Sequence, residues 1–475
     1  MAQTTTPLPT PARYCPLAVG AAVTALLILL AYWGGFPQDV SLALLVGGLG
    51  LLIGILLLFG FLIYWFYVSP LPESEARGIV ANRSPLAREI IASGSTIMAI
   101  LIVIGLFWDE LWHRLYGVGL VVDDFWWRPH ILIYASMAIN SLFALGGMAL
   151  ITWRGHGTLR QRFLAEPLLG LMTLVAGFQV VTAPLDPMWH QVYGLDITAW
   201  SLPHLFLWIG LFSVMVVGSS VQLSLVPTRA WRGLGGFTLR EGIAALLLAL
   251  GVVLTLQFGT TEWEALTPAS LTRDRPFLQR PEWLYLVVMM SICAFIGMLG
   301  LHLFRRVGVT TLIFTLALGV RLLLLTVFDA ASPPANLGFY GNLFLLAPGL
   351  TLDLWYAYRL RRGKVEGSAL VGSLLMAAVM LLVGIPLVAE VMIYPRINSS
   401  TLPGMIVFTP LAALVFGAAG ARVGTWLRAH GQTADQVEAE AGTGRERILW
   451  IGAGALVAVL AFVALFITTA TPPLT

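Results

Sequence analysis

Two stretches of this chain carry the same ordered set of reactive and aromatic side chains: Asp, Trp, His, Tyr, Gly, Asp, Trp, Pro and His. The first copy contains Asp109, Trp112, His113, Tyr116, Gly117, Asp123, Asp124, Trp127, Pro129 and His130. The second contains Asp186, Trp189, His190, Tyr193, Gly194, Asp196, Trp200, Pro203 and His204. The copies lie 77 residues apart and hold four of the seven histidines. We interpret them as an internal duplication and expect the function of the protein to lie there.

The carboxylate and imidazole groups of the second copy suit a metal ion. Asp186 precedes His190 by four residues, so a helix continuing through His190 presents both on one face. Pro203 favours the first turn of the next helix, which brings His204 back to the same depth. Two antiparallel helices would then offer one carboxylate and two imidazoles to copper(II), zinc, iron(II) or manganese.

The first copy offers an equivalent set on a longer connecting loop: Asp109, His113 and His130. We therefore predict either two matching clusters or one shared site. The remaining acidic groups of the motif could supply a fourth ligand or orient an imidazole. They are Asp123, Asp124 and Asp196.

A purely structural interpretation of the motif also exists. Tryptophan and tyrosine gather at bilayer interfaces because their rings are amphipathic. The motif region carries six such tryptophans: Trp108, Trp112, Trp126, Trp127, Trp189 and Trp200. Carboxylates at helix ends can also cap helices or pair with Arg114 and Arg128. The duplication favours the metal, because an interfacial belt does not require two matched histidines in each copy.

The composition predicts an all-α, polytopic membrane protein. The chain of 475 residues is 58% hydrophobic and 11% charged, whereas soluble domains carry about 25% charged residues. Many apolar runs exceed the roughly 20 residues that cross a bilayer. The net charge of +3 is small and dispersed, so nucleic acid is not an expected partner. The expected partners are the lipid bilayer and other membrane subunits.

Hydrophobic runs predict about thirteen transmembrane helices. Their approximate ranges are 17–36, 41–68, 90–111, 129–153, 164–185, 203–226, 241–258, 282–304, 308–328, 338–358, 368–393, 403–427 and 448–470. Arginine-rich loops alternate with basic-poor ones, and the positive-inside rule places the former in the cytoplasm. We therefore expect a cell-membrane protein with a cytoplasmic N-terminus, an extracytoplasmic C-terminus and both motifs on the extracytoplasmic side.

The expected organisation follows from these spans. Residues 1–16 form a disordered cytoplasmic tail, and 17–89 a helical hairpin with its connector. Residues 90–226 hold the duplication, as repeat 1 (about 90–153) and repeat 2 (about 164–226), and 227–475 form a C-terminal helical bundle. Intramembrane charges mark functional candidates. Arg321, two turns before Asp329, is expected to pair with it or to extend toward the interface.

The second copy resembles the metal site of the C subunit of the copper membrane monooxygenases, the particulate methane and ammonia monooxygenases. Asp186, His190 and His204 match that pattern with one extra residue before the last ligand, and Asp109, His113 and His130 with a longer loop. The resemblance covers about thirty residues per copy, and that subunit is shorter and carries the site once. It implies a transition metal, with copper favoured over zinc or iron, and a metal-dependent oxidoreductase.

Two other functions fit the same sequence. An ion or metal transporter would use many spans and intramembrane charges, although the repeat here is parallel rather than inverted. A polytopic lipid-linked glycosyltransferase would use an acidic pair in an early outward loop, here Asp109–Glu110 or Asp123–Asp124. Metal analysis distinguishes the first function from the glycosyltransferase, and a flux measurement tests the transporter.

Overall fold

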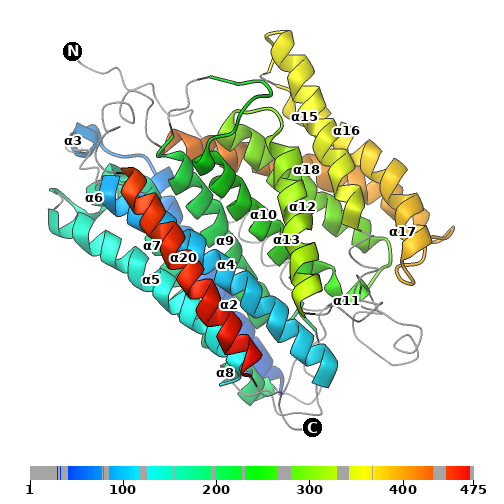
Figure 1. Ribbon diagram of the computed structural model, residues 1–475, viewed down its shortest axis with the longest axis horizontal. Coiled ribbons are helices and arrows are strands. Elements are labelled where there is room, and N and C mark those ends of the chain that lie inside the picture. The colour runs from blue at the N-terminus through cyan, green and yellow to red at the C-terminus, as the bar shows by residue number, and fades with distance from the viewer. Residues whose placement is uncertain are drawn as a thin grey trace.

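A computed structural model describes the chain over residues 29, 33, 41–77, 79, 85–116, 126–154, 156–193, 198–226, 230–264, 280–328, 342–365, 367–431 and 445–470. Within these ranges the protein is all-helical and its only β-pairing is an isolated bridge between Arg232 and Arg306. The helices lie side by side in one bundle (Figure 1). The predicted all-α membrane class is confirmed.

The first half of the chain contains the duplicated region. Its elements are α2 (Leu42–Ile63), the π-helical turn η1 (Tyr64–Val68), α3 (Glu73–Arg77), α4 (Pro85–Tyr116), α5 (Arg128–Arg154), α6 (Leu159–Ala165), α7 (Pro167–Thr182), α8 (Leu185–Tyr193) and α9 (Leu202–Leu223). Helices α4 and α5 carry the first copy of the motif, α8 and α9 carry the second, and α7 leads into α8.

The second half completes the bundle. Its elements are α10 (Leu239–Gly259), α11 (Thr261–Glu264), α12 (Leu284–Phe304), α13 (Val309–Phe328), the 3-10 turn η4 (Leu343–Leu345), α15 (Leu346–Arg361), α16 (Ala369–Val379), the π-helical turn η5 (Met380–Gly384), α17 (Ile385–Val391), α18 (Leu402–Ala429) and α20 (Arg445–Thr468).

Eleven helices of the described residues are long and apolar enough to cross a membrane. They fall on eleven of the thirteen predicted ranges. The range 17–36 lies outside the described residues except for positions 29 and 33. The range 338–358 differs, because its helix α15 begins only at Leu346 and has 16 residues. At about 1.5 Å rise per residue, α15 is shorter than the hydrocarbon layer that a full span must cross.

The four long helices of the two copies form one unit. Helix α4 packs on α5, and α7 packs on α9; α5 also packs on α7, and α4 on α9. Exchanging the copies, α4 for α7 and α5 for α9, leaves this contact pattern unchanged. The duplication remains a prediction, but the packing is what a parallel repeat would give.

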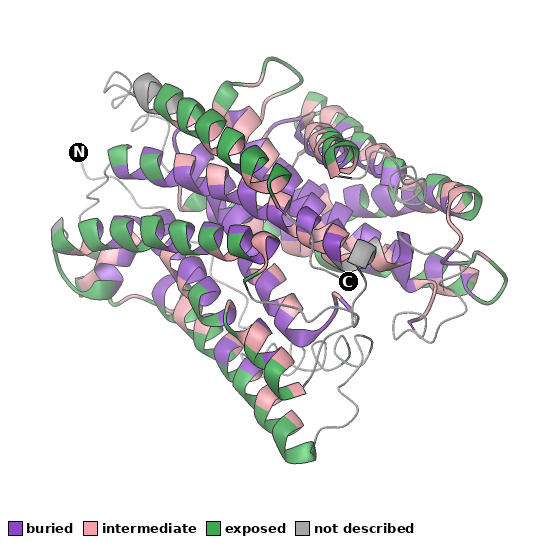
Figure 2. Ribbon diagram, turned by 60° about the horizontal axis from the view of Figure 1, so that its bottom comes forward, coloured by how far each residue is buried: buried purple, intermediate pink, exposed green. Residues whose placement is uncertain are grey.

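Burial increases from the edge of the bundle to its centre. Helices α9, α10 and α12 are mostly buried, whereas α2 and α20 expose most of their side chains (Figure 2). The closest helix crossing joins α12 to α18. A Cβ added to Gly420 would lie 2.2 Å from the Phe295 carbonyl oxygen, and one added to Gly424 would lie 2.6 Å from that of Leu299. Only glycine permits this backbone approach.

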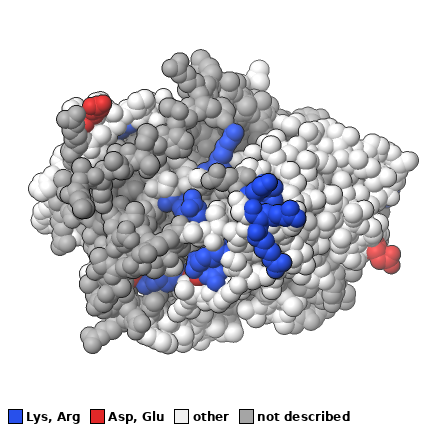
Figure 3. All heavy atoms as spheres, turned by 90° about the horizontal axis from the view of Figure 1, so that it is seen from above, with Lys and Arg blue, Asp and Glu red and all other residues white. Residues whose placement is uncertain are grey.

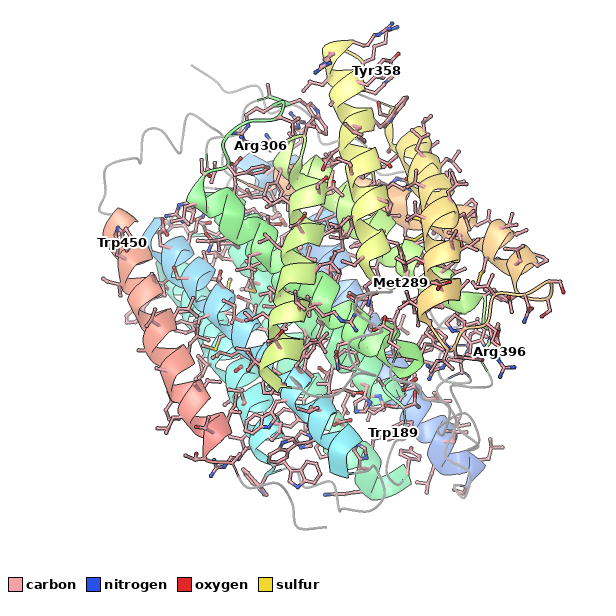
Figure 4. The ribbon with its side chains drawn as sticks, turned by 45° about the vertical axis from the view of Figure 1, so that its right-hand side comes forward. Trp189, Met289, Arg306, Tyr358, Arg396 and Trp450 are labelled. Atoms are coloured by element: carbon pink, nitrogen blue, oxygen red, sulfur yellow. The ribbon has the colours of Figure 1, made fainter. Side chains whose placement is uncertain are left out.

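One end of the bundle carries a cluster of basic side chains. Lysine and arginine side chains gather on the end seen in Figure 3. Arg306 lies toward that end, and Trp189 of α8 lies at the opposite one (Figure 4). The motif helix α8 therefore lies at the end away from this basic surface.

Candidate metal centre

Asp186 and His190 are placed by the short helix α8. The sequence predicts that the preceding helix continues through His190, but that helix ends at Thr182 and a new one begins at Leu185. Pro184 explains the break, since proline lacks the N–H that a continuing helix needs. The spacing still holds within α8: Asp186 Oδ1 lies 3.4 Å from His190 Nε2.

His204 comes from the start of the next helix, as predicted. Ser201 precedes the first residue of α9 and Pro203 lies in its first turn, so His204 is the third helical residue. Its Nε2 lies 3.2 Å from Asp186 Oδ1. The structure thus brings Asp186, His190 and His204 together, with one ligand atom from each within 4.8 Å of the others.

These separations match the edges of a metal coordination polyhedron. With bonds of about 2.0–2.2 Å, neighbouring donors of a tetrahedral or octahedral ion lie about 2.8–3.6 Å apart. Both oxygen–nitrogen distances, 3.2 and 3.4 Å, fall in this interval. Asp186 is buried, and His204 keeps 26% of its side chain exposed, which leaves the cluster accessible from outside.

A backbone carbonyl orients the His204 ring. His204 Nδ1 lies 3.3 Å from the Thr198 carbonyl oxygen. That oxygen can only accept, so Nδ1 must carry the proton in this contact. In the neutral ring Nε2 then presents a lone pair to the Asp186 carboxylate, which is also an acceptor. A cation, either a proton on Nε2 or a metal ion, must lie between them.

Tyr134 is a neighbour of Asp186 that the sequence argument missed. Its hydroxyl lies 3.4 Å from Asp186 Oδ2 and donates to it, so both carboxylate oxygens have polar neighbours. Tyr134 lies on α5, one turn after His130 of the other copy. That spacing of four was visible in the sequence, but only the packing of α5 beside α7 connects Tyr134 to Asp186.

In the first copy of the motif, the described side chains include one Asp–His pair. Asp109 of α4 and His130 of α5 meet at 2.9 Å between Oδ1 and Nε2, and Trp127 stacks on the His130 ring. The His113 side chain lies outside the described residues, as do Asp123, Asp124 and Asp196 of both copies' loops. The prediction of a three-ligand first cluster therefore stays untested.

The two half-sites adjoin each other. His130 contacts Tyr134 edge-on, with ring centroids 6.1 Å apart, and Tyr134 reaches Asp186. A chain of direct contacts thus runs from Asp109 through His130 and Tyr134 to Asp186. This adjacency favours one composite site over two distant ones.

Most tryptophans of the motif are not an interfacial belt. Trp126 is exposed and Trp127 half-buried, but the other four are buried: Trp108, Trp112, Trp189 and Trp200. They pack between helices; Trp108, for example, contacts Trp112 and Phe466 of α20. Among the six, Trp127 stacks on a histidine of the motif, His130.

Two further ion pairs are buried or partly buried, and one of them includes Arg321. Arg321 pairs with Glu264 of α11. Asp329, the partner expected from the sequence, lies outside the described residues, so that pairing stays a prediction. Glu264 also accepts from Tyr285 and Asn342, at 3.3 and 3.1 Å. Glu262, also on α11, pairs with Arg280. Burial lowers the pKa of Arg280, and Glu262 partly offsets that effect.

Comparisons with protein-family models, with curated proteins and with solved structures find no match to this chain. The assignment of this site therefore depends on its own geometry.

Proposed function

We propose that this chain is a multi-pass membrane protein that holds a transition-metal ion at Asp186, His190 and His204, with copper the favoured ion. One observation carries the proposal: a single buried carboxylate oxygen, Asp186 Oδ1, lies 3.2 and 3.4 Å from the Nε2 atoms of two histidines. Asp109 and His130 supply the adjoining half of a composite site.

A metal ion accounts for this cluster better than protons do. With protons alone, a neutral His190 can donate from Nε2 to Asp186, but His204 must become an imidazolium, because its Nδ1 proton already faces the Thr198 carbonyl. A cationic ring in this largely buried setting is costly to desolvate. One divalent ion satisfies both lone pairs and the carboxylate together, while Tyr134 satisfies the second carboxylate oxygen.

The choice of copper follows from the resemblance to the C subunit of the copper membrane monooxygenases. Bound copper supplies one-electron redox chemistry, and on this basis we propose a metal-dependent oxidoreductase. Two imidazoles and one carboxylate with open positions also suit iron(II). The identity of the ion in protein purified from its own cells decides between the two.

We further propose that the site faces the extracytoplasmic side, with the N-terminus in the cytoplasm and the C-terminus outside. The support is the basic surface at the end of the bundle away from α8 (Figures 3 and 4) together with the positive-inside rule. A cysteine placed at exposed Ser400 should react with an impermeant reagent on intact cells, and one at exposed His156 should not. The reverse pattern would contradict the orientation.

The test of the function is metal content. The full-length protein and its His190→Ala and His204→Ala variants are purified and analysed by elemental mass spectrometry. His156→Ala is the control, because His156 is exposed and outside both copies. We expect stoichiometric metal in the wild type and control, and a loss in both motif variants. Full metal content in both would show that these histidines are structural.

Ion transport is a second candidate, favoured by the buried Glu264–Arg321 pair inside the helix bundle, where charges often mark ion paths. Ion flux in proteoliposomes that depends on Glu264 would favour transport.

A further inference from the structure

We propose that Arg280 and Glu262 are positioning residues for His204. They fix the turn at Thr198–Ser201 so that its carbonyl holds His204 Nδ1 and leaves Nε2 to the metal. The inference deepens the proposed function and depends on it. Neither residue belongs to the duplicated motif, and neither touches the cluster directly.

Arg280 holds the turn from its side-chain end. Its Nη2 donates to Thr198 Oγ1 at 2.6 Å, its Nε donates to the Trp33 carbonyl at 3.0 Å, and its Nη1 pairs with Glu262. The guanidinium carbon also lies 4.0 Å from the centroid of the Trp200 ring. The Arg280 side chain is fully buried, so this geometry is determined from several directions at once.

The Glu262 side chain holds the turn by a hydrogen bond to the backbone of the turn. One carboxylate oxygen accepts from Arg280, and the other accepts from the Ala199 N–H at 2.6 Å. Charge-assisted hydrogen bonds of this kind are shorter and about twice as strong as neutral ones. The Arg280–Glu262 pair therefore contacts two successive residues of the turn, Thr198 and Ala199.

The position of the Thr198–Ser201 turn determines which nitrogen of His204 faces Asp186. The Thr198 carbonyl accepts from Ser201 N–H at 3.3 Å and lies 3.3 Å from His204 Nδ1. A partner on one ring nitrogen selects the tautomer and orientation in which the other nitrogen binds metal. If the turn shifts, the Thr198 carbonyl no longer fixes the tautomer and ring orientation of His204.

The magnitude follows from the general behaviour of such partners. Removing a group that orients a metal-bound histidine typically weakens metal binding by about 10–100-fold. We expect Arg280→Gln to fall in this range, because it loses the charge and most of the donors. Glu262→Gln keeps an acceptor and the side-chain volume, so its loss should lie near the lower limit.

The experiment titrates the full-length protein in detergent with Cu(II) against a competing chelator. It compares the wild type, Arg280→Gln, Glu262→Gln and a control, Arg88→Gln. Arg88 is equally buried and paired with Glu166, but it lies in the first turns of α4, at the far end from Asp109. We expect the folded fraction of the Arg88→Gln protein to bind Cu(II) with the affinity of the wild type.

Pulsed electron paramagnetic resonance supplies a second readout. Modulation from the remote nitrogen of copper-bound imidazole depends on the hydrogen bond at that nitrogen, which here is His204 Nδ1. We expect the Arg280→Gln and Glu262→Gln spectra to change at one imidazole, together with the fall in affinity. Unchanged affinity and spectra in both folded variants would overturn the inference. If the wild type itself binds no Cu(II), the proposed function fails, and this inference with it.

Discussion

Glu264 is the shared acceptor of a buried polar cluster, and its replacement should lower the free energy of unfolding substantially. Glu264→Met removes the acceptor of Arg321, Tyr285 and Asn342 at once and leaves the Arg321 charge buried. Breaking a buried ion pair by deleting one partner typically costs about 3–5 kcal/mol. We therefore expect a loss of free energy of unfolding in that range.

The second variant tests the reasoning behind that number. Glu264→Met combined with Arg321→Met removes both charges and fills a similar volume with apolar atoms. Such replacements are often neutral or stabilising, so the double variant should recover most of the loss. Glu390→Ala, at an exposed glutamate of α17, should change the free energy by less than about 0.5 kcal/mol.

The assay is reversible unfolding in mixed micelles of increasing dodecyl sulfate content, followed by helical circular dichroism. The reasoning would be refuted if Glu264→Met lost less than about 1 kcal/mol. It would equally be refuted if the double variant stayed as unstable as the single one, since the damage would then not come from the unpaired charge.

Two further predictions concern packing and pH. Gly420→Ala should destabilise the fold strongly, because its Cβ would overlap the Phe295 carbonyl oxygen, whereas Gly454→Ala meets no neighbouring atoms and should be neutral or stabilising; thermal unfolding compares them. Burial lowers the pKa of His430, whose Nδ1 donates to the Trp426 carbonyl at 2.8 Å. The folded state therefore binds a proton at His430 less readily than the unfolded state does. The free energy of unfolding is then unaffected by His430 above the unfolded pKa of about 6.5, and it declines as the pH falls below that value. His430→Gln should reduce that decline, and an identical pH profile would contradict it.

The sequence could predict the spans and the ligands because both depend on local pattern. Hydrophobic runs place eleven helices close to their observed bounds, and the spacing of Asp186 and His190 places both on one helical face even though Pro184 interrupts the longer helix. The start of α9 at Leu202 and the position of His204 follow from Pro203.

The partners of those ligands could not be predicted, because they come from tertiary packing. The Thr198 carbonyl that orients His204 is a backbone group without a sequence signature. Tyr134 reaches Asp186 only because α5 packs beside α7. Arg321 pairs with Glu264 of α11, 57 residues earlier in the chain, and spacing along the chain cannot identify such a neighbour in space.

The central claim is that Asp186, His190 and His204 bind one metal ion, and X-ray absorption at the copper edge of the copper-loaded protein tests it most directly. The account predicts a first shell of nitrogen and oxygen at about 2.0–2.2 Å, with the outer-shell scattering of at least two imidazole rings. His204→Ala should remove one ring from that shell. A shell containing sulfur, or an imidazole count unchanged by both His190→Ala and His204→Ala, would contradict the account.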